Sequence, residues 1–251
     1  MKMWYTIVSD SWHPGGRKWR PFRPKIESFE VALYAQTFPS WWKFPQERTV
    51  KWKWLSEAFP PIYAHFLFSY KLGLEDFTLL DLFAGIGGWS LGAVISGARK
   101  VVMIEIDKRK CQYLETNFTI LKRYLEGHHD FEFKIIRGDV REVLKDGPKE
   151  EFDVIVASPP CEDASVLRAL SHTYGLELRG TFPLTRWYLE WCEKYESPLA
   201  LYENVISTKL EEMLRRYGWT VEKHDMGKVI PQRRRRIIAI RKTRQKITSF
   251  L

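Results

Sequence analysis

The sequence predicts an α/β protein with a doubly wound, mostly parallel sheet of seven strands. Between residues 77 and 240, short apolar runs of strand length alternate with segments of helical period. A glycine-rich turn joins the first of these strands to the helix that follows it. The chain has 251 residues, 45% of them hydrophobic, which is enough to bury one full core. We therefore expect one main domain at residues 56–251 and a small appendage at residues 1–55.

The first half of the main domain begins with a helix that has prolines in its first turn and Gly73 at its end. Three apolar strands follow, separated by helical segments. The expected elements, in order, are a helix at 56–71, a strand at 77–83, a helix from Trp89, a strand at 100–107, a helix at 108–125 and a strand at 131–137.

The second half begins with a buried strand that two prolines stop, because proline cannot donate to a sheet ladder. A long segment of poor periodicity comes next, and segments of this kind near a reactive group are often mobile lids. The expected elements are a strand at 152–157, the lid at 162–183, a helix at 184–195, a strand at 199–205, a helix at 209–217 and closing strands at 219–226 and 235–240.

Polar residues and glycines stand where the predicted strands end. Residues 84–88 form the glycine turn, whose backbone N–H groups can approach a ligand closely. Glu105 follows it by about 20 residues, the spacing at which an acid binds ribose hydroxyls in nucleotide-binding folds. Asp139, after the third strand, suits either an adenine amino group or the cap of the next helix. The pattern predicts a nucleotide-like ligand at this edge.

Cys161 follows the fourth strand directly, after Pro159 and Pro160. An isolated cysteine is more often a small apolar residue than a nucleophile. The fifth strand ends in Glu203 and Asn204, and parallel strands bring their carboxyl ends to one edge, where ligands bind. The sequence therefore places a thiol and a carboxylate at the same edge of the sheet.

The appendage is rich in tryptophan and in basic residues, and a basic loop in it carries Arg17, Lys18 and Arg20. Cations among aromatic rings suit phosphates and unstacked bases, although several of the tryptophans are expected to form a core of their own. The net charge of +9 favours a polyanionic partner. The run of four arginines at 233–236 fits either a solvated surface or a phosphate clamp.

Composition excludes several other classes. The three cysteines are scattered and form no CxxC pair, so we expect neither a disulfide framework nor a metal site. No apolar run reaches the length of a membrane span, and the N-terminus lacks a signal-peptide pattern. We therefore expect a cytoplasmic protein without a membrane partner.

Taken in order, five stretches resemble motifs of the cytosine-C5 DNA methyltransferase family, over roughly residues 57 to 242. They correspond to its S-adenosylmethionine loop, its nucleophile, the end of its catalytic loop, its Glu-Asn-Val motif and its Gln-x-Arg-x-Arg motif. The stretches are Asp81–Gly88, Pro159–Cys161, Gly175–Phe182, Glu203–Val205 and Gln232–Arg236. The resemblance implies the Rossmann-like fold of class I S-adenosylmethionine-dependent methyltransferases, and a catalytic role for residues 56–251.

The resemblance also implies an activity. The enzyme would transfer a methyl group from S-adenosylmethionine to C5 of a flipped-out cytosine in double-stranded DNA, through a covalent adduct between Cys161 and C6. The implied catalytic residues are Cys161, Glu203, Arg234 and Asn204. The implied cofactor-binding residues are Asp81, Phe83, Gly85, Gly87, Gly88, Glu105, Ile106, Asp139, Val140 and Pro159. The implied nucleic-acid-binding residues are Gln232, Arg236 and Arg179, together with Arg17, Lys18 and Arg20 of the appendage. A monomer and a cognate restriction endonuclease as partner are further expectations.

Two departures from the family accompany this resemblance. Only about fifteen residues follow Arg236, whereas the family usually has a recognition domain and a last helix there. The stretch Glu57–Ala64 resembles that last helix. This resemblance suggests a circularly permuted order of the motifs. Glu162 stands where the family usually has glutamine, and its charge would raise the pKa of the adjacent thiol. Three alternatives stay open: C5 methylation of RNA, amino-group methylation that uses Ser158-Pro159-Pro160 without a thiol, and an inactive nucleic-acid-binding homologue.

Overall fold

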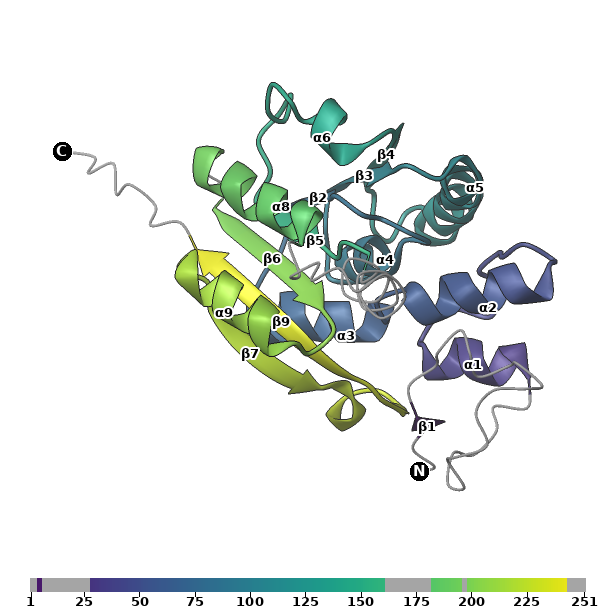
Figure 1. Cartoon of the computed structure of the whole chain (residues 1–251). Coiled ribbons are helices and arrows are strands. Elements are labelled where there is room, and N and C mark those ends of the chain that lie inside the picture. The colour runs from purple at the N-terminus through teal and green to yellow at the C-terminus, as the bar shows by residue number, and fades with distance from the viewer. Residues whose placement is uncertain (1–3, 6–27, 161–181, 196–197, 243–251) are drawn as a thin grey trace.

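The computed structural model describes residues 4–5, 28–160, 182–195 and 198–242. A seven-stranded sheet crosses its centre in the order β4-β3-β2-β5-β6-β9-β7 (Figure 1). β9 alone among these seven runs opposite to the others, because it pairs antiparallel with both β6 and β7. The strands are β2 (Thr78–Asp81), β3 (Lys100–Glu105), β4 (Glu132–Arg137), β5 (Val154–Ala157), β6 (Leu199–Asn204), β7 (Thr220–Asp225) and β9 (Arg235–Lys242). The predicted sheet is confirmed.

Helices cover both faces of this sheet, as a doubly wound fold requires. One apolar cluster joins the sheet to the helices on the first face, and a second cluster joins it to those on the other (Figure 1). The first group is α1 (Phe29–Ala35), α2 (Arg48–Glu57), α3 (Pro61–His65), the π-helix η2 (Phe66–Lys71), α4 (Gly88–Ile95) and α5 (Lys108–Leu125). The second is α6 (Val140–Val143), α8 (Pro183–Lys194) and α9 (Thr208–Arg216).

The helix expected at 56–71 differs from the structure. Ser56 belongs to the end of α2, the chain is extended at Ala58 and Pro60, and α3 begins only at Pro61. Neither proline has an N–H to donate to a preceding helical turn, so the two helices cannot be continuous. Gly73, with φ 63°, follows the end of η2 as expected.

The described part of the predicted appendage packs into the same core as the sheet. Trp42, Trp52 and Trp54 are buried in the first apolar cluster, which confirms that several tryptophans serve packing. β1 (Trp4–Tyr5) pairs parallel with β8 (Gln232–Arg233) in a separate two-stranded sheet. Residues 4–5 thereby lie beside the first two residues of the arginine motif.

Register brings the predicted strand-end residues together. Asp81, the last residue of β2, lies opposite Met103 of β3 and Val156 of β5. β6 extends beyond β5 to Glu203 and Asn204, and antiparallel β9 starts at this same edge. The carboxyl edge therefore carries acids from three strands and the beginning of the arginine-bearing strand.

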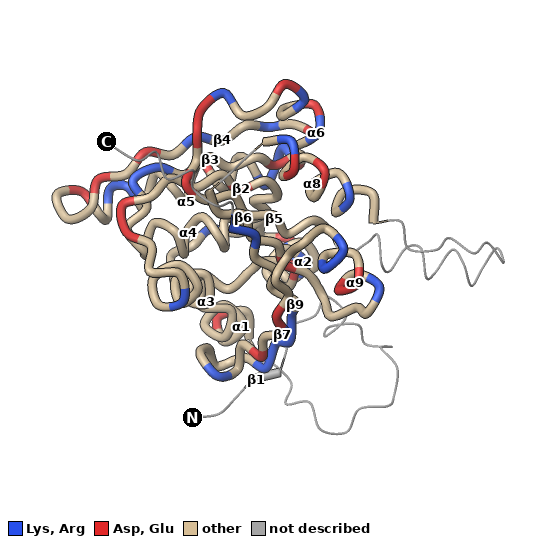
Figure 2. Tube along the Cα trace, turned by 90° about the vertical axis from the view of Figure 1, so that its left-hand side faces the viewer, with Lys and Arg blue, Asp and Glu red and all other residues tan. Residues whose placement is uncertain are grey.

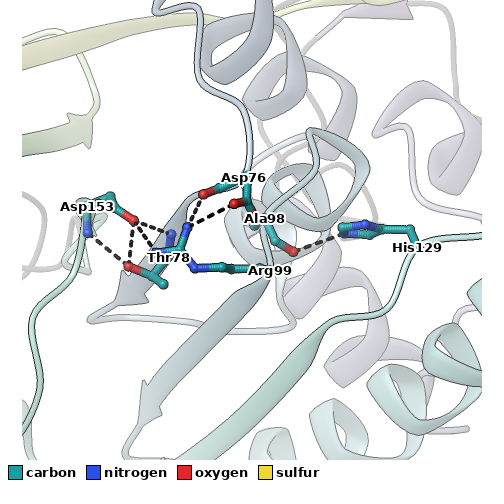
Figure 3. A network of polar contacts seen from close by, with 6 residues as sticks. All are labelled: Asp76, Thr78, Ala98, Arg99, His129 and Asp153. Atoms are coloured by element: carbon teal, nitrogen blue, oxygen red, sulfur yellow. Dashed lines mark hydrogen bonds and ion pairs between the residues drawn. The ribbon is translucent and has the colours of Figure 1, made fainter.

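The amino edge of the sheet is closed by an ordinary polar network (Figure 3). Oδ2 of Asp153 accepts hydrogen bonds from the Thr78 backbone N–H at 2.8 Å, from the Thr78 hydroxyl at 3.0 Å and from Arg99 at 3.1 Å. Arg99 also faces Asp76, and His129 contacts the carbonyl of Ala98 at 3.0 Å. These contacts join the start of β2 to the segments that lead into β3, β4 and β5.

Candidate active site

The three glycines of the turn after β2 are required for different reasons. Gly85 has φ 57°, and a Cβ built there would meet nothing closer than a backbone oxygen at 4.0 Å. Gly87 has φ 86°, and its Cβ would lie 2.8 Å from the Phe118 ring. A Cβ on Gly88 would lie 2.0 Å from the carbonyl oxygen of Phe59. Gly85 thus leaves open space where a ligand can approach, whereas Gly87 and Gly88 permit close packing.

Asp81 is fully buried beneath this turn. Ser90 donates a hydrogen bond to its Oδ2 at 2.8 Å, while Oδ1 has no partner of normal geometry among the described residues. Burial raises the pKa of Asp81 to about 7, and the nearby Glu105 adds to this effect. A buried carboxyl oxygen without a donor is uncommon, and it often marks a site that a ligand completes.

Glu105 holds the glycine turn in place. Its Oε2 accepts from the Gly85 N–H at 2.8 Å, and its Oε1 accepts from the Asp107 N–H at 2.9 Å. Each carboxylate oxygen has a further lone pair, so Glu105 keeps the capacity to accept from ribose hydroxyls, and that contact stays a prediction. Ile106 follows with 66% of its surface exposed, an apolar side chain at the edge that suits the face of a base. These features fit an adenosine group.

Asp139 has the capping role that the sequence left open. It is the N-cap of α6, accepts from the Arg141 backbone N–H at 2.9 Å and pairs with the Arg141 guanidinium at 2.6 Å. This guanidinium lowers the pKa of Asp139. Val140 is buried in the second apolar cluster. A contact of Asp139 with an adenine amine stays a prediction.

The turn that leads to Cys161 is held from two sides. Trp89 of α4 donates its indole N–H to the Ser158 hydroxyl at 2.8 Å. Asn204 of β6 donates its side-chain amide to the carbonyl of Pro159 at 3.2 Å. The strand followed by prolines predicts this turn, and the Asn204 bond ties the turn to β6. Cys161 itself lies outside the described residues.

Glu203 is paired with an arginine other than the one expected to be catalytic. Arg236 Nε lies 3.0 Å from Glu203 Oε1, and both side chains are largely buried. Arg234, the expected catalytic arginine, is 2% exposed and donates to the carbonyl of Ser56 at the end of α2 at 3.1 Å. Because Arg234 lies between β8 and β9, the local strand alternation does not carry its side chain to Glu203. The structure thus places Arg236 beside the carboxylate and Arg234 against α2.

Gln232 also differs from its expected position at a nucleic-acid surface. It is fully buried, and its amide donates to Gln36 Oε1 at 2.5 Å and to the Ala35 carbonyl at 3.2 Å. These bonds fasten β8 to the end of α1. A contact between Gln232 and nucleic acid would require this buried amide to leave its partners.

Several other expectations fall outside the described residues. They concern most of the proposed lid and the predicted nucleic-acid contacts at Arg179, Arg17, Lys18 and Arg20. Within the part of the chain that the structure describes, no group of three or more His, Cys, Asp or Glu side chains could hold a metal ion. No helix in that part is long and apolar enough to cross a membrane.

The sequence analysis did not predict the buried residues that hydrogen-bond to the glycine turn, to Ser158 and to Asp81. Trp42 donates its indole N–H to the Ile86 carbonyl in the glycine turn at 3.2 Å, and Ser90 and Trp89 make the bonds given above. Aromatic residues next to glycines look like ordinary core in a sequence. Only the direction of each indole N–H distinguishes them.

A model of the family described as C-5 cytosine-specific DNA methylase matches residues 77–249, more than half of the chain. The chain belongs to this family. Its cofactor is S-adenosylmethionine, which supplies an electrophilic methyl group on a sulfonium sulfur. The open space at Gly85, the unsatisfied oxygen of Asp81 and the exposed Ile106 fit such a cofactor.

Relatives support this assignment over part of their own length. The chain is 25% identical over 190 residues to type II methyltransferase M1.HphI of Haemophilus parahaemolyticus, covering 70% of this chain and 48% of that protein. It is 30% identical over 92 residues to type II methyltransferase M.Eco47II of Escherichia coli, covering 37% and 19%. The chain thus spans about half, or less, of the length of these curated relatives.

A solved structure shows the same fold. The human methyltransferase 10 domain containing protein superposes with a TM-score of 0.52 at 15% identity, over 79% of this chain and 86% of that chain. The Rossmann-like fold expected from the resemblance, that of class I methyltransferases, is therefore confirmed.

Proposed function

We propose that this protein transfers a methyl group from S-adenosylmethionine to C5 of cytosine in DNA. The observation that carries the proposal is the Glu203–Arg236 pair, which lies at the same sheet edge as the Ser158–Pro160 turn and the glycine turn. A buried carboxylate fixed by a guanidinium is suited to hydrogen bonding with a neutral or protonated heterocycle.

C5 of cytosine is too weak a nucleophile to take a methyl group unaided, so the reaction requires a second nucleophile that adds to C6. The Cys161 thiolate would add to C6, and the electrons of the C5–C6 double bond would move to C5. C5 would then take the methyl group as the sulfonium S–CH3 bond breaks and S-adenosylhomocysteine leaves. A base would remove the C5 proton, the double bond would re-form and the thiolate would leave. Glu203 would accept from the exocyclic amine and share a proton with N3, which stabilises the negative charge that develops on the ring. Arg236 would keep Glu203 in that orientation.

The surface around this edge favours a polyanionic substrate. Lys228 and Arg233, between β7 and β9, and Arg235, the first residue of β9, are exposed at the carboxyl edge of the sheet. Figure 2 shows Lys and Arg along the ends of β7 and β9, beside β1. The whole chain carries a net charge of +9. Phosphates bound at this turn would bring a flipped base towards Glu203.

The decisive experiment combines labelled S-adenosylmethionine with duplex DNA, single-stranded DNA and RNA of matched sequence. We expect label in duplex DNA and 5-methylcytosine on bisulfite sequencing. Cys161→Ala should abolish transfer, whereas Cys192→Ala, which removes a buried thiol from α8, should leave it intact. A duplex with 5-fluorocytosine should trap a covalent complex, because C5 then has no proton to lose.

Each alternative would give a distinct result. Label in RNA alone would establish RNA as the substrate. Full activity of Cys161→Ala would establish amino-group methylation. Transfer to no nucleic acid, with S-adenosylmethionine still bound, would establish an inactive homologue.

The proposal includes the permuted order of motifs. α3 packs against α4 so closely that a Cβ on Gly92 would lie 2.4 Å from Ala64 Cβ and 2.6 Å from the Pro61 carbonyl. α3 can pack against α4, the helix that follows the glycine turn, whether it precedes or follows the sheet in the chain. A variant with residues 57–72 moved behind residue 242 by linkers should fold and bind S-adenosylmethionine; loss of folding would contradict the permutation.

Two further expectations concern partners. The curated relatives named above are type II methyltransferases, and a restriction endonuclease that cuts at the methylated sequence would be the matching partner. DNA from cells expressing the protein should then resist such a nuclease. Sedimentation of the free protein should give a monomer.

A further inference from the structure

We propose that Trp89 is a positioning residue that couples the cofactor turn to the turn bearing Cys161, through its hydrogen bond to Ser158. The proposal rests on the function proposed above, since it assigns Trp89 to the geometry of that reaction. Trp89 is the second residue of α4 and directly follows the glycine turn. Ser158 lies three residues before Cys161.

The indole of Trp89 is immobilised by its neighbours. It is 3% exposed, and its ring stacks on Phe59 with centroids 3.8 Å apart and planes 6° apart. The Phe68 ring lies 5.6 Å away at a tilt of 55°. A ring held in this way has almost no rotamer freedom, so its N–H points in one direction, towards Ser158 Oγ at 2.8 Å.

The Ser158 bond is one of two anchors on the same turn. Asn204 holds the Pro159 carbonyl from β6, and Asn204 directly follows Glu203. The turn is therefore fixed between α4, which begins at the cofactor turn, and β6, which carries the ring-binding carboxylate. A shift of the start of α4 when the cofactor binds would be passed to the chain that leads to Cys161.

Packing alone does not account for a tryptophan at this position. Phenylalanine would also stack on Phe59 and fill most of the space, without a donor that needs a partner. A buried indole N–H is costly unless it is hydrogen-bonded, and Ser158 supplies that bond. The pair of residues is thus matched in chemistry as well as in shape.

The experiment compares Trp89→Phe, Ser158→Ala and the double variant with Trp191→Phe as matched control. Trp191 is a buried tryptophan of α8 whose indole N–H donates to the Leu144 carbonyl at 3.3 Å, on the other face of the sheet. All variants are tested for kcat, for KM with DNA, for S-adenosylmethionine affinity and for Tm.

We expect kcat to fall about 5- to 10-fold in each single variant at the pair, because a neutral hydrogen bond contributes roughly 1 kcal/mol. The double variant should be no slower than the slower single variant, since both changes break one bond. Cofactor affinity should change less than about twofold. Trp191→Phe should lower Tm to a similar extent with kcat unchanged. A loss of kcat in Trp89→Phe no greater than in Trp191→Phe, or additive effects, would overturn the proposal.

A readout without catalysis separates this proposal from the proposed function. In the wild type, S-adenosylmethionine should slow amide hydrogen exchange at Cys161 and Glu162, and Trp89→Phe should remove most of that protection. If the wild type transfers no methyl group, the proposed function fails while this coupling is still measured. If the cofactor protects these amides equally in both proteins, the coupling through Trp89 is refuted.

Discussion

The two edges of the central sheet are built in opposite ways. At the amino edge, the side chains of Asp153 and Asp76 are 48% and 82% exposed and pair with Arg99, itself 47% exposed. At the carboxyl edge, Asp81, Glu105 and Glu203 are all buried. Exposed ion pairs contribute little to stability, whereas burying a carboxyl group costs free energy unless it is well partnered.

This difference indicates where the fold serves function. At the amino edge, Asp76 and Asp153 both have Arg99 as an ionic partner. The carboxyl edge concentrates acids, one of them with an unsatisfied oxygen, where stability alone would favour apolar residues. Buried ionisable groups that gather beside a glycine turn are typical of a ligand site.

The largest expected effect is a difference in kcat between variants at the two edges of the sheet. Glu203→Gln should lower kcat about 1,000-fold, because the base loses a charged hydrogen-bond partner in the transition state. Asp153→Asn, the same kind of change at the amino edge, should leave kcat within about twofold. Steady-state methylation of duplex DNA measures both. Equal losses in the two variants would mean that the edges do not differ in function.

The next effect is a pH dependence of stability at Asp81. Burial raises its pKa to about 7 in the folded protein, against an unfolded value near 3.9. The folded state therefore binds the proton more tightly, and stability falls as pH rises from about 4 to 7. Asp81→Asn should abolish this fall in stability, because asparagine does not ionise. The unfolding free energy of the variant minus that of wild type should therefore rise by about 2–4 kcal/mol between pH 4 and pH 8.

Urea unfolding at several pH values, without cofactor, measures this difference. Asp139→Asn is the matched control, because the pKa of Asp139 is lowered in the folded protein. The unfolding free energy of this variant relative to wild type should not rise with pH. A flat difference between Asp81→Asn and wild type would show that Asp81 is ionised in the fold at neutral pH.

Two arginines of one motif provide a third test. Arg236→Lys should lower kcat about 100-fold with a small change in Tm, since it removes the Nε–H group that faces Glu203 Oε1. Arg234→Lys should lower Tm with a smaller effect on kcat, because Arg234 binds the end of α2. Parallel kinetic and thermal measurements check this assignment. The reverse pattern would restore Arg234 as the residue that acts on the base.

The smallest effect concerns the outer surface. Lys228→Glu with Arg235→Glu should raise KM for DNA about 10-fold at low salt, with kcat little changed, and should reduce the salt dependence of binding. Lys122→Glu with Arg123→Glu makes the same charge change on exposed residues of α5, near the amino edge. Equal KM values for the two double variants would mean that net charge alone attracts the DNA.

Much of this architecture follows from local patterns along the chain. The apolar runs and the glycine turn predicted all seven strands of the main sheet in order, and the helices at 108–125, 184–195 and 209–217 agree with the structure to within one residue. Residues that end a parallel strand must share an edge, so Asp81, Glu105 and Glu203 could be grouped in advance. The range 56–71 predicted for one helix extends to both sides of Pro60 and Pro61, whereas α3 begins at Pro61.

The sequence by itself determined the fold, the edge that carries the site and the family motifs, because periodicity and strand-end position are local properties. Only the tertiary structure decided which arginine meets Glu203, that Gln232 is fastened to α1 and that Trp89 holds the turn before Cys161. The physical reason is that alternation shows which residues share a face of a strand. The partner that each polar atom finds depends on helices brought there from distant parts of the chain.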